Sequence, residues 1–114
     1  MPCSPAYAAP ELLRGVVSEQ ADIYAVGHLI IECLTGRTAY GDLDAISAMV
    51  ANLGSDEVPI PQSVLDGPFG TAVKGALHKD PAERWRSAAD LLEEMELGWA
   101  YANDLCVEMR RPVL

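Results

Sequence analysis

The side chains that most often carry chemistry are few and scattered in this sequence. His28 lies in an apolar run with no carboxylate or cysteine pattern beside it, which favours a packed side chain over a catalytic base. His78 lies near a predicted helix C-terminus, where the helix dipole favours a cation without any catalytic role. Because the cysteines are odd in number and far apart, they predict neither a disulfide framework nor a zinc cluster: Cys3, Cys33 and Cys106.

Three charged residues lie where a charge would matter to a fold or a site. Asp22 falls in the first turn of a predicted helix, where the helix dipole favours a carboxylate. Glu11 belongs to the segment "SPAYAAPELL", and Arg84 belongs to "KDPAERW". Residue type alone leaves Glu11 and Arg84 as two solvated charges, because nothing in their local sequence brings them together.

Helices are the elements expected to position these charges. Residues 1–17 should be loop, apart from a turn at "PELLRG", because three prolines and a glycine interrupt them. Ser18 is a predicted N-cap for a helix that runs to about Leu34 and ends at "TGR". This helix is apolar nearly all round, so we expect it to lie at the centre of the domain.

Amphipathic helices should surround that central helix. One is predicted to start at Asp42 or Asp44 and to end at Gly54, with apolar residues at 45, 46, 49, 50 and 53 on one face. Two prolines in residues 54–67 predict an extended, irregular connection. A further helix is predicted for about 68–78, and a short helical turn for "DPAE", where Asp80 caps and Pro81 takes the first helical position.

The last helix is predicted to open at Ser87 and to end at Gly98. Its inward residues should be Ala88, Leu91, Leu92 and Met95, with acidic residues outside. The tail carries a further helical stripe: Trp99, Ala102, Leu105, Cys106 and Met109. With no strand pattern longer than a few residues, the sequence predicts an all-α fold.

Composition bounds the partners and the compartment. A chain of 114 residues with 50% apolar residues predicts one globular domain. The net charge of −9 repels nucleic acid and anionic membranes, so a protein partner is favoured over both. No signal peptide is visible after Met1, and the longest apolar run, at 23–34, is too short to cross a bilayer. We therefore expect a soluble, cytoplasmic protein.

Three segments, taken in order, resemble the C-lobe of serine/threonine protein kinases. "SPAYAAPE" is similar to the "GTPxYxAPE" segment that closes the kinase activation loop, and "SEQADIYAVGHLIIECLTGR" resembles the central helix of the lobe. "ALHKDPAERWRSAADLL" is similar to its closing helices. The likeness covers about residues 3–96 and is closest to the bacterial eukaryotic-type kinases. It implies a truncated kinase-like fold, the helical subdomain of the C-lobe, with a central apolar helix surrounded by amphipathic helices.

The resemblance also implies roles for single residues. Glu11 would form a buried ion pair with Arg84 and tie the end of the activation segment to the helical subdomain. Asp22 would anchor the backbone of the catalytic loop; in this chain, which lacks that loop, it can equally be a first-turn acid. The substrate loop would consist of Ser4, Pro5, Ala6 and Tyr7. Two residues there depart from the family pattern, Cys3 in place of glycine and Ala8 in place of a larger side chain.

A kinase active site needs a glycine-rich loop, a strand lysine, a catalytic aspartate and metal-holding Asn and Asp residues. The 114 residues contain no glycine-rich loop, no "HRD" and no "DFG", all of which precede the "APE" segment in kinases. We therefore expect no catalytic, cofactor-binding or metal-binding residue in this chain. ATP and Mg would belong to a complete kinase, and the chain alone should be inactive.

Residues 1–98 are thus interpreted as a partial kinase C-lobe and residues 99–114 as a C-terminal extension. Three hypotheses follow for function. The chain is an inactive part of a kinase domain, a pseudokinase-like binding module that docks a kinase substrate or regulator, or a lobe that completes a kinase in trans with a partner that contains the missing lobe. Each hypothesis requires a protein partner.

Overall fold

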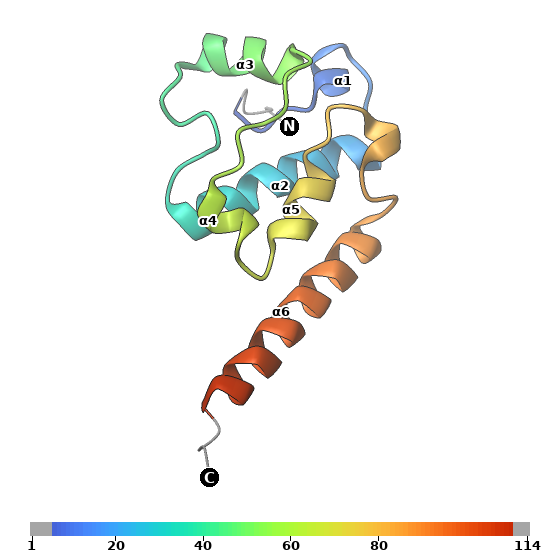
Figure 1. The fold of residues 1–114 in the computed structure, drawn as a ribbon. Coiled ribbons are helices and arrows are strands. Elements are labelled where there is room, and N and C mark those ends of the chain that lie inside the picture. The colour runs from blue at the N-terminus through green and yellow to red at the C-terminus, as the bar shows by residue number, and fades with distance from the viewer. Residues whose placement is uncertain (1–5, 111–114) are drawn as a thin grey trace.

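A computed structural model describes the backbone of residues 6–110 and the side chains of residues 6–104. Within that range the chain is helical, without strands, which confirms the all-α prediction (Figure 1). None of its helices is both long and apolar enough to cross a membrane. In chain order the elements are α1 (Pro10–Leu13), α2 (Glu19–Thr35), α3 (Ala45–Leu53), α4 (Gln62–Leu65), α5 (Gly70–Ala76), the 3₁₀ turn η1 (Pro81–Glu83) and α6 (Ala88–Arg110).

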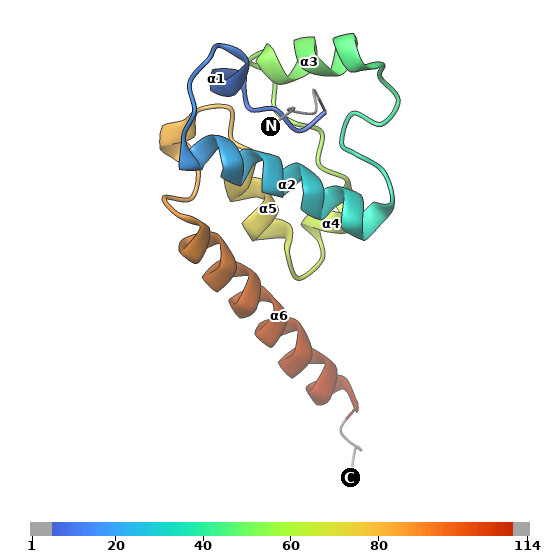
Figure 2. The ribbon, with the colours of Figure 1, turned by 180° about the vertical axis from the view of Figure 1, so that it is seen from behind.

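Helix α2 lies at the centre, as its composition predicts, with α1 and α3 on one side and α5 on the other (Figures 1 and 2). It begins where Ser18 Oγ accepts a hydrogen bond from the backbone N–H of Ala21 (3.2 Å). It ends at Gly36, whose φ of 79° is the left-handed conformation favoured by glycine at a helix C-terminus. One face of α2 remains exposed, and it includes the apolar side chains of Val26 and Leu29.

Helices α2 and α5 pack closely at Gly27. A Cβ atom there would lie 2.9 Å from the Leu77 side chain and 3.0 Å from the Ala76 Cβ, so a larger residue would push the helices apart. Two clusters of buried apolar side chains fill the core. One joins α2 to α5 and the 58–64 segment, and the other joins α2, α5 and the start of α6 through Ile23, Ala72, Ala76 and Leu91.

Helix α3 begins as predicted, because Asp44 Oδ1 accepts a hydrogen bond from the backbone N–H of Ser47 (2.7 Å). Its apolar face exists, but much of it points to solvent: Ile46 is 72% exposed and Val50 is 60% exposed. The buried residues of α3 are Ala48 and Asn52 instead. A small side chain and a hydrogen-bonded amide thus pack against α2, which apolar periodicity cannot predict.

The connection predicted as irregular between 54 and 67 contains α4, one helical turn that follows Pro61. A single turn is too short to show a periodic pattern, so the sequence gave no signal for it. The next helix, α5, is shorter than the predicted 68–78, because it starts at Gly70 and ends at Ala76.

The prediction that the last helix ends at Gly98 is wrong, because α6 continues through that residue to Arg110. Glycine is needed there for packing: a Cβ atom at Gly98 would lie 1.9 Å from the carbonyl oxygen of Pro68. Leu91 is buried and Met95 packs against the core, but Leu92, predicted to face inward, is 55% exposed. The division of the chain into residues 1–98 and 99–114 stays a prediction.

A substitution at Gly98 tests this explanation. Glycine to alanine normally stabilises a helix by about 1 kcal/mol. We expect Gly98→Ala to lower the free energy of unfolding by about 1–3 kcal/mol instead, because the new methyl group meets the Pro68 backbone. Urea denaturation followed by circular dichroism measures the difference. A stabilised Gly98→Ala protein would show that α6 does not approach Pro68 this closely.

Candidate functional site

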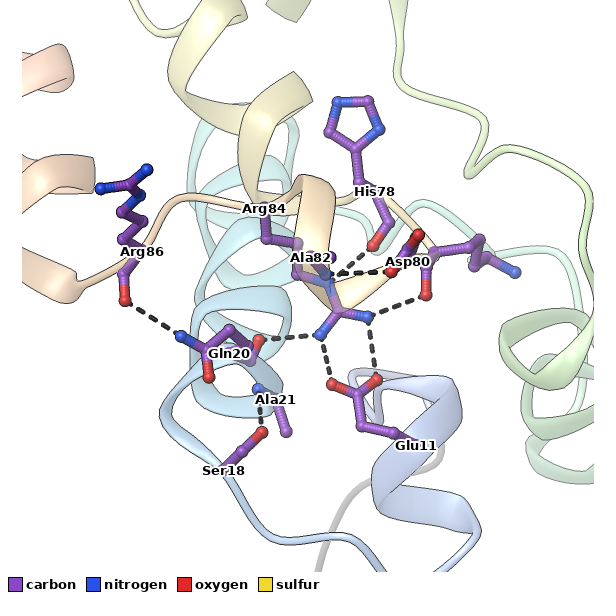
Figure 3. Close-up of polar contacts among 10 residues, drawn as sticks. Glu11, Ser18, Gln20, Ala21, His78, Asp80, Ala82, Arg84 and Arg86 are labelled. Atoms are coloured by element: carbon purple, nitrogen blue, oxygen red, sulfur yellow. Dashed lines mark hydrogen bonds and ion pairs between the residues drawn. The ribbon is translucent and has the colours of Figure 1, made fainter.

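The side chain of Arg84 lies fully buried where η1 ends, and each of its five N–H groups donates a hydrogen bond (Figure 3). Nε donates to the carbonyl oxygen of His78 (2.6 Å). Nη1 donates to Glu11 Oε2 (2.5 Å) and to the carbonyl oxygen of Gln20 (2.9 Å). Nη2 donates to Glu11 Oε1 (2.9 Å) and to the carbonyl oxygen of Lys79 (3.2 Å). The guanidinium charge is therefore paired and its donors are satisfied.

Glu11 lies in the single turn α1, and its carboxylate meets Arg84 in a bidentate geometry, the strongest form of such a pair. Its side chain is 12% exposed. Burial acts to raise the pKa of Glu11, but the hydrogen bonds from Arg84 and from its own backbone, with the charges of Arg84 and Arg14, outweigh burial. The pKa of Glu11 therefore lies below its ordinary value. On its other side Arg84 contacts Tyr24, with Cζ 4.8 Å from the ring centroid.

Further polar contacts fix the same region. Gln20 Nε2 donates to the carbonyl oxygen of Arg86 (3.0 Å), as Figure 3 shows. Glu19 Oε1 accepts a hydrogen bond from the backbone N–H of Ala88, at the start of α6 (3.1 Å). The N-terminus of α2 is thus joined to the segment that follows η1. Together with the Arg84 pair, these contacts hold α1, α2 and α6 in one arrangement.

Lys79 links this region to α3. Its Nζ donates to the carbonyl oxygens of Ala51 (2.7 Å), Asn52 (3.2 Å) and Gly54 (2.7 Å), which end α3. A cation at a helix C-terminus is favoured both by the unpaired carbonyl groups and by the helix dipole. Burial lowers the pKa of Lys79, while the charge of Asp56 acts in the opposite direction.

Of the four predicted substrate-loop residues, Ser4 and Pro5 lie outside the described residues. Ala6 and Tyr7 are partly buried and precede α1. The hydroxyl of Tyr7 donates a hydrogen bond to Glu32 Oε2, near the C-terminus of α2. The loop is therefore joined to the central helix at one end and, through Glu11, to Arg84 at the other.

A buried polar cluster lies under this loop. His28 is fully buried, and its Nε2 lies 3.2 Å from Asn52 Oδ1, which also accepts the Tyr24 hydroxyl (2.5 Å). Since Asn52 Oδ1 is an acceptor, Nε2 carries the proton, and Nδ1 has no hydrogen-bond partner among the described residues. The rings of Tyr7, Tyr24 and Tyr40 surround the imidazole, so the interpretation of His28 as a packed side chain is confirmed.

The environment keeps the His28 imidazole neutral. Burial lowers its pKa to about 4, and the charge of Lys79 acts in the same direction, whereas the hydrogen bond with Asn52 acts against the shift. At neutral pH the ring is an uncharged part of the core that connects α2 to α3.

Asp22 lies in the first turn of α2 and is exposed. Continuing from it along one face of the helix, Val26, Leu29 and Cys33 are exposed as well. Their spacing of four, three and four residues places them in one stripe on the helix surface. The role of Asp22 as an anchor for a catalytic loop stays a prediction, and this stripe is the surface such a loop would cover.

Sequence reasoning missed several residues that support the site. Tyr24 gave no signal for its contact with Arg84, and Asn52 and Lys79 gave none for their positions beside α2 and α3. Glu32 did carry a signal, because it is a lone acid in an apolar helix, and such a residue usually has a partner. Its partner Tyr7 is 25 positions away, which the sequence alone cannot indicate.

Comparison with known proteins gives consistent relatives. Serine/threonine-protein kinase PknL of Mycobacterium tuberculosis is 35% identical over 112 residues, which are 94% of this chain and 27% of PknL. PknD of the same species is 37% identical over 90 residues, 75% of this chain and 13% of PknD. Mitogen-activated protein kinase kinase kinase 13-A of Xenopus laevis is 39% identical over 82 residues, 69% of this chain and 8% of that kinase. No protein-family model matches the chain.

The chain thus spans about a quarter of the length of PknL and a smaller share of the other two kinases. The similarity covers the described site, since most of the chain is aligned.

The buried His28 predicts a pH dependence of stability. Its pKa is about 4 in the folded protein and 6.5 in the unfolded chain, so its neutral form stabilises the fold above pH 6.5. As the pH falls from 6.5 to 4, the unfolded state binds the proton first and about 3 kcal/mol of stability is lost. Urea denaturation at a series of pH values should therefore give a shallower decline for His28→Gln than for the original protein.

The exposed His78 serves as the matched control. His78→Gln should leave the decline between pH 6.5 and 4 unchanged. Equal declines in the original protein and in His28→Gln would contradict the burial of a neutral imidazole.

Proposed function

Because the chain belongs to the serine/threonine protein kinase family, as part of the kinase C-lobe, we propose that it acts as the substrate-side helical subdomain of such a kinase. In this role it does no chemistry itself. It holds the loop formed by residues 4–7 in a fixed position for a catalytic centre built from other residues. The observation that carries the proposal is the buried pair of Glu11 and Arg84, which anchors α1 directly after that loop.

The residues present do not fit an Mg-ATP site. The sequence lacks the glycine-rich loop, the "HRD" and the "DFG" that hold nucleotide and metal in kinases. Within the described part of the chain, no group of three or more His, Cys, Asp or Glu side chains could hold a metal ion. The 114 residues alone therefore neither bind Mg-ATP nor transfer a phosphoryl group; ATP and Mg belong to the complete kinase.

The exposed stripe on α2 supports completion by another protein segment. Val26 and Leu29 are large apolar side chains on the central helix, and Asp22 lies at the end of the same stripe. Contiguous exposed apolar side chains mark interaction surfaces. We assign this stripe to the remainder of a kinase domain, joined in the same polypeptide or bound in trans, in the cytoplasm.

A second candidate function is that of a binding module, which the exposed face of α3 favours. Leu43, Ile46 and Val50 are all large, apolar and exposed, and they lie near or on one helix that is separate from the α2 stripe. A kinase substrate or regulator would dock on this face by apolar burial. The two candidates therefore use different surfaces of the molecule.

Titration calorimetry of the purified chain with Mg-ATP is expected to show no binding. The chain is then mixed with a PknL kinase domain that stops before its own "APE" segment, and complex formation is measured by sedimentation. We expect a complex that Leu29→Glu abolishes and Val50→Glu leaves intact, because a charge on the α2 stripe cannot be buried without a partner.

The reverse pattern, with binding lost in Val50→Glu alone, would favour the binding module over completion of a kinase. Tight Mg-ATP binding by the chain alone would contradict both candidates, since it would require a nucleotide site within these 114 residues.

A further inference from the structure

The second half of α6 extends away from the rest of the molecule. The first half packs on α5, and Trp99 stacks on Phe69 with ring centroids 6.2 Å apart and planes 13° apart. Beyond Trp99 the helix continues to Arg110 and leaves the packed helices behind (Figures 1 and 2). An isolated helical segment of about 12 residues is only marginally stable in water. This half of α6 therefore gains from a partner surface.

Apolar residues follow α6 with alternating spacings of three and four: Leu92, Met95, Trp99, Ala102, Cys106 and Met109. This is the a and d pattern of a coiled coil, in which one apolar seam faces a second helix. Two large members of the seam are open to solvent, since Leu92 is 55% exposed and Trp99 is 54% exposed. Met95 lies at the edge of the core. The seam is thus available along most of the helix.

The seam complements itself when two copies run antiparallel. With the midpoint between Trp99 and Ala102, the large Trp99 of each copy faces the small Ala102 of the other. The same register sets Met95 opposite Cys106 and Leu92 opposite Met109. Large and small residues then alternate across the interface, as knobs-into-holes packing requires.

The charges of α6 favour the same direction. The first half carries Asp90, Glu93, Glu94 and Glu96, whereas its last residue is Arg110. A parallel pair would bring the acidic halves together, which is repulsive. An antiparallel pair places Arg110 of one copy near the acidic residues of the other, and it places the two packed helical bodies at opposite ends.

We propose that α6 binds a second copy of this chain as an antiparallel two-helix pair through the Leu92 to Met109 seam. The partner is another copy, because the spacing, the side-chain sizes and the charges of the seam all complement the seam itself. This homodimer uses neither the α2 stripe nor the exposed face of α3.

Sedimentation equilibrium of the full 114-residue chain tests the proposal, with a monomer mass of 12.2 kDa. We expect a mass twice that value at high protein concentration. Ala102→Glu puts a charge at the centre of the seam and should return the protein to monomer. Ala100→Glu makes the same change on the outer face of the helix and should leave the dimer intact. Circular dichroism confirms that both variants retain their folded bodies.

Cross-linking tests the direction of the helices, in a protein that carries Cys3→Ser and Cys33→Ser. In the antiparallel register, mild oxidation should link two copies only after Met95→Cys, which sets a thiol opposite Cys106. A covalent dimer through Cys106 alone would show a parallel pair and overturn the proposed register. A monomer at all concentrations, or a dimer that Ala102→Glu does not weaken, would overturn the interface itself.

Discussion

The arrangement of this subdomain depends on one buried cation. A guanidinium group loses its hydration when it is buried, and the loss is offset only if the charge is paired and each N–H group finds an acceptor. Arg84 meets that requirement with the carboxylate of Glu11 and the carbonyl groups of Gln20, His78 and Lys79. These acceptors come from α1, from the start of α2 and from the connection after α5. None of the three can move without leaving a buried donor or charge unpaired.

Other contacts extend this constraint toward the surface. Lys79, whose carbonyl group accepts from Arg84, uses its ammonium group to hold the end of α3. Tyr7 joins the segment before α1 to Glu32, so the substrate loop is held by α2 as well as by Glu11. The same central helix exposes the apolar Leu29 to solvent. The subdomain is therefore internally fixed around Arg84, while the face of α2 proposed to meet the rest of a kinase stays open.

Helix starts were predictable, because they depend on contacts within three residues. Ser18, Asp44 and Ser87 each accept a hydrogen bond from a nearby backbone N–H, and their residue types indicate this. Gly98 misled the prediction, since a packing glycine and a helix-ending glycine look alike until the neighbour, here Pro68, is known.

The site was predictable only through family resemblance. Glu11 and Arg84 are separated by 73 positions, and no local pattern joins two residues so far apart. The resemblance named them, but it did not indicate the contact of Tyr24 with Arg84 or the hydrogen bond of Asn52 with His28. Such contacts arise from tertiary packing, which a single sequence does not encode in any short segment.

A double-mutant cycle on Glu11→Ala and Arg84→Ala, read as free energies of unfolding in urea, tests the central claim most directly. The exposed pair of Arg37 and Asp42 supplies a matched cycle on the same protein. We predict a coupling energy of about 3 kcal/mol for the buried pair and less than about 1 kcal/mol for the exposed pair. A coupling energy for Glu11 and Arg84 no larger than that of the surface pair would contradict the claim that this buried pair holds the subdomain together.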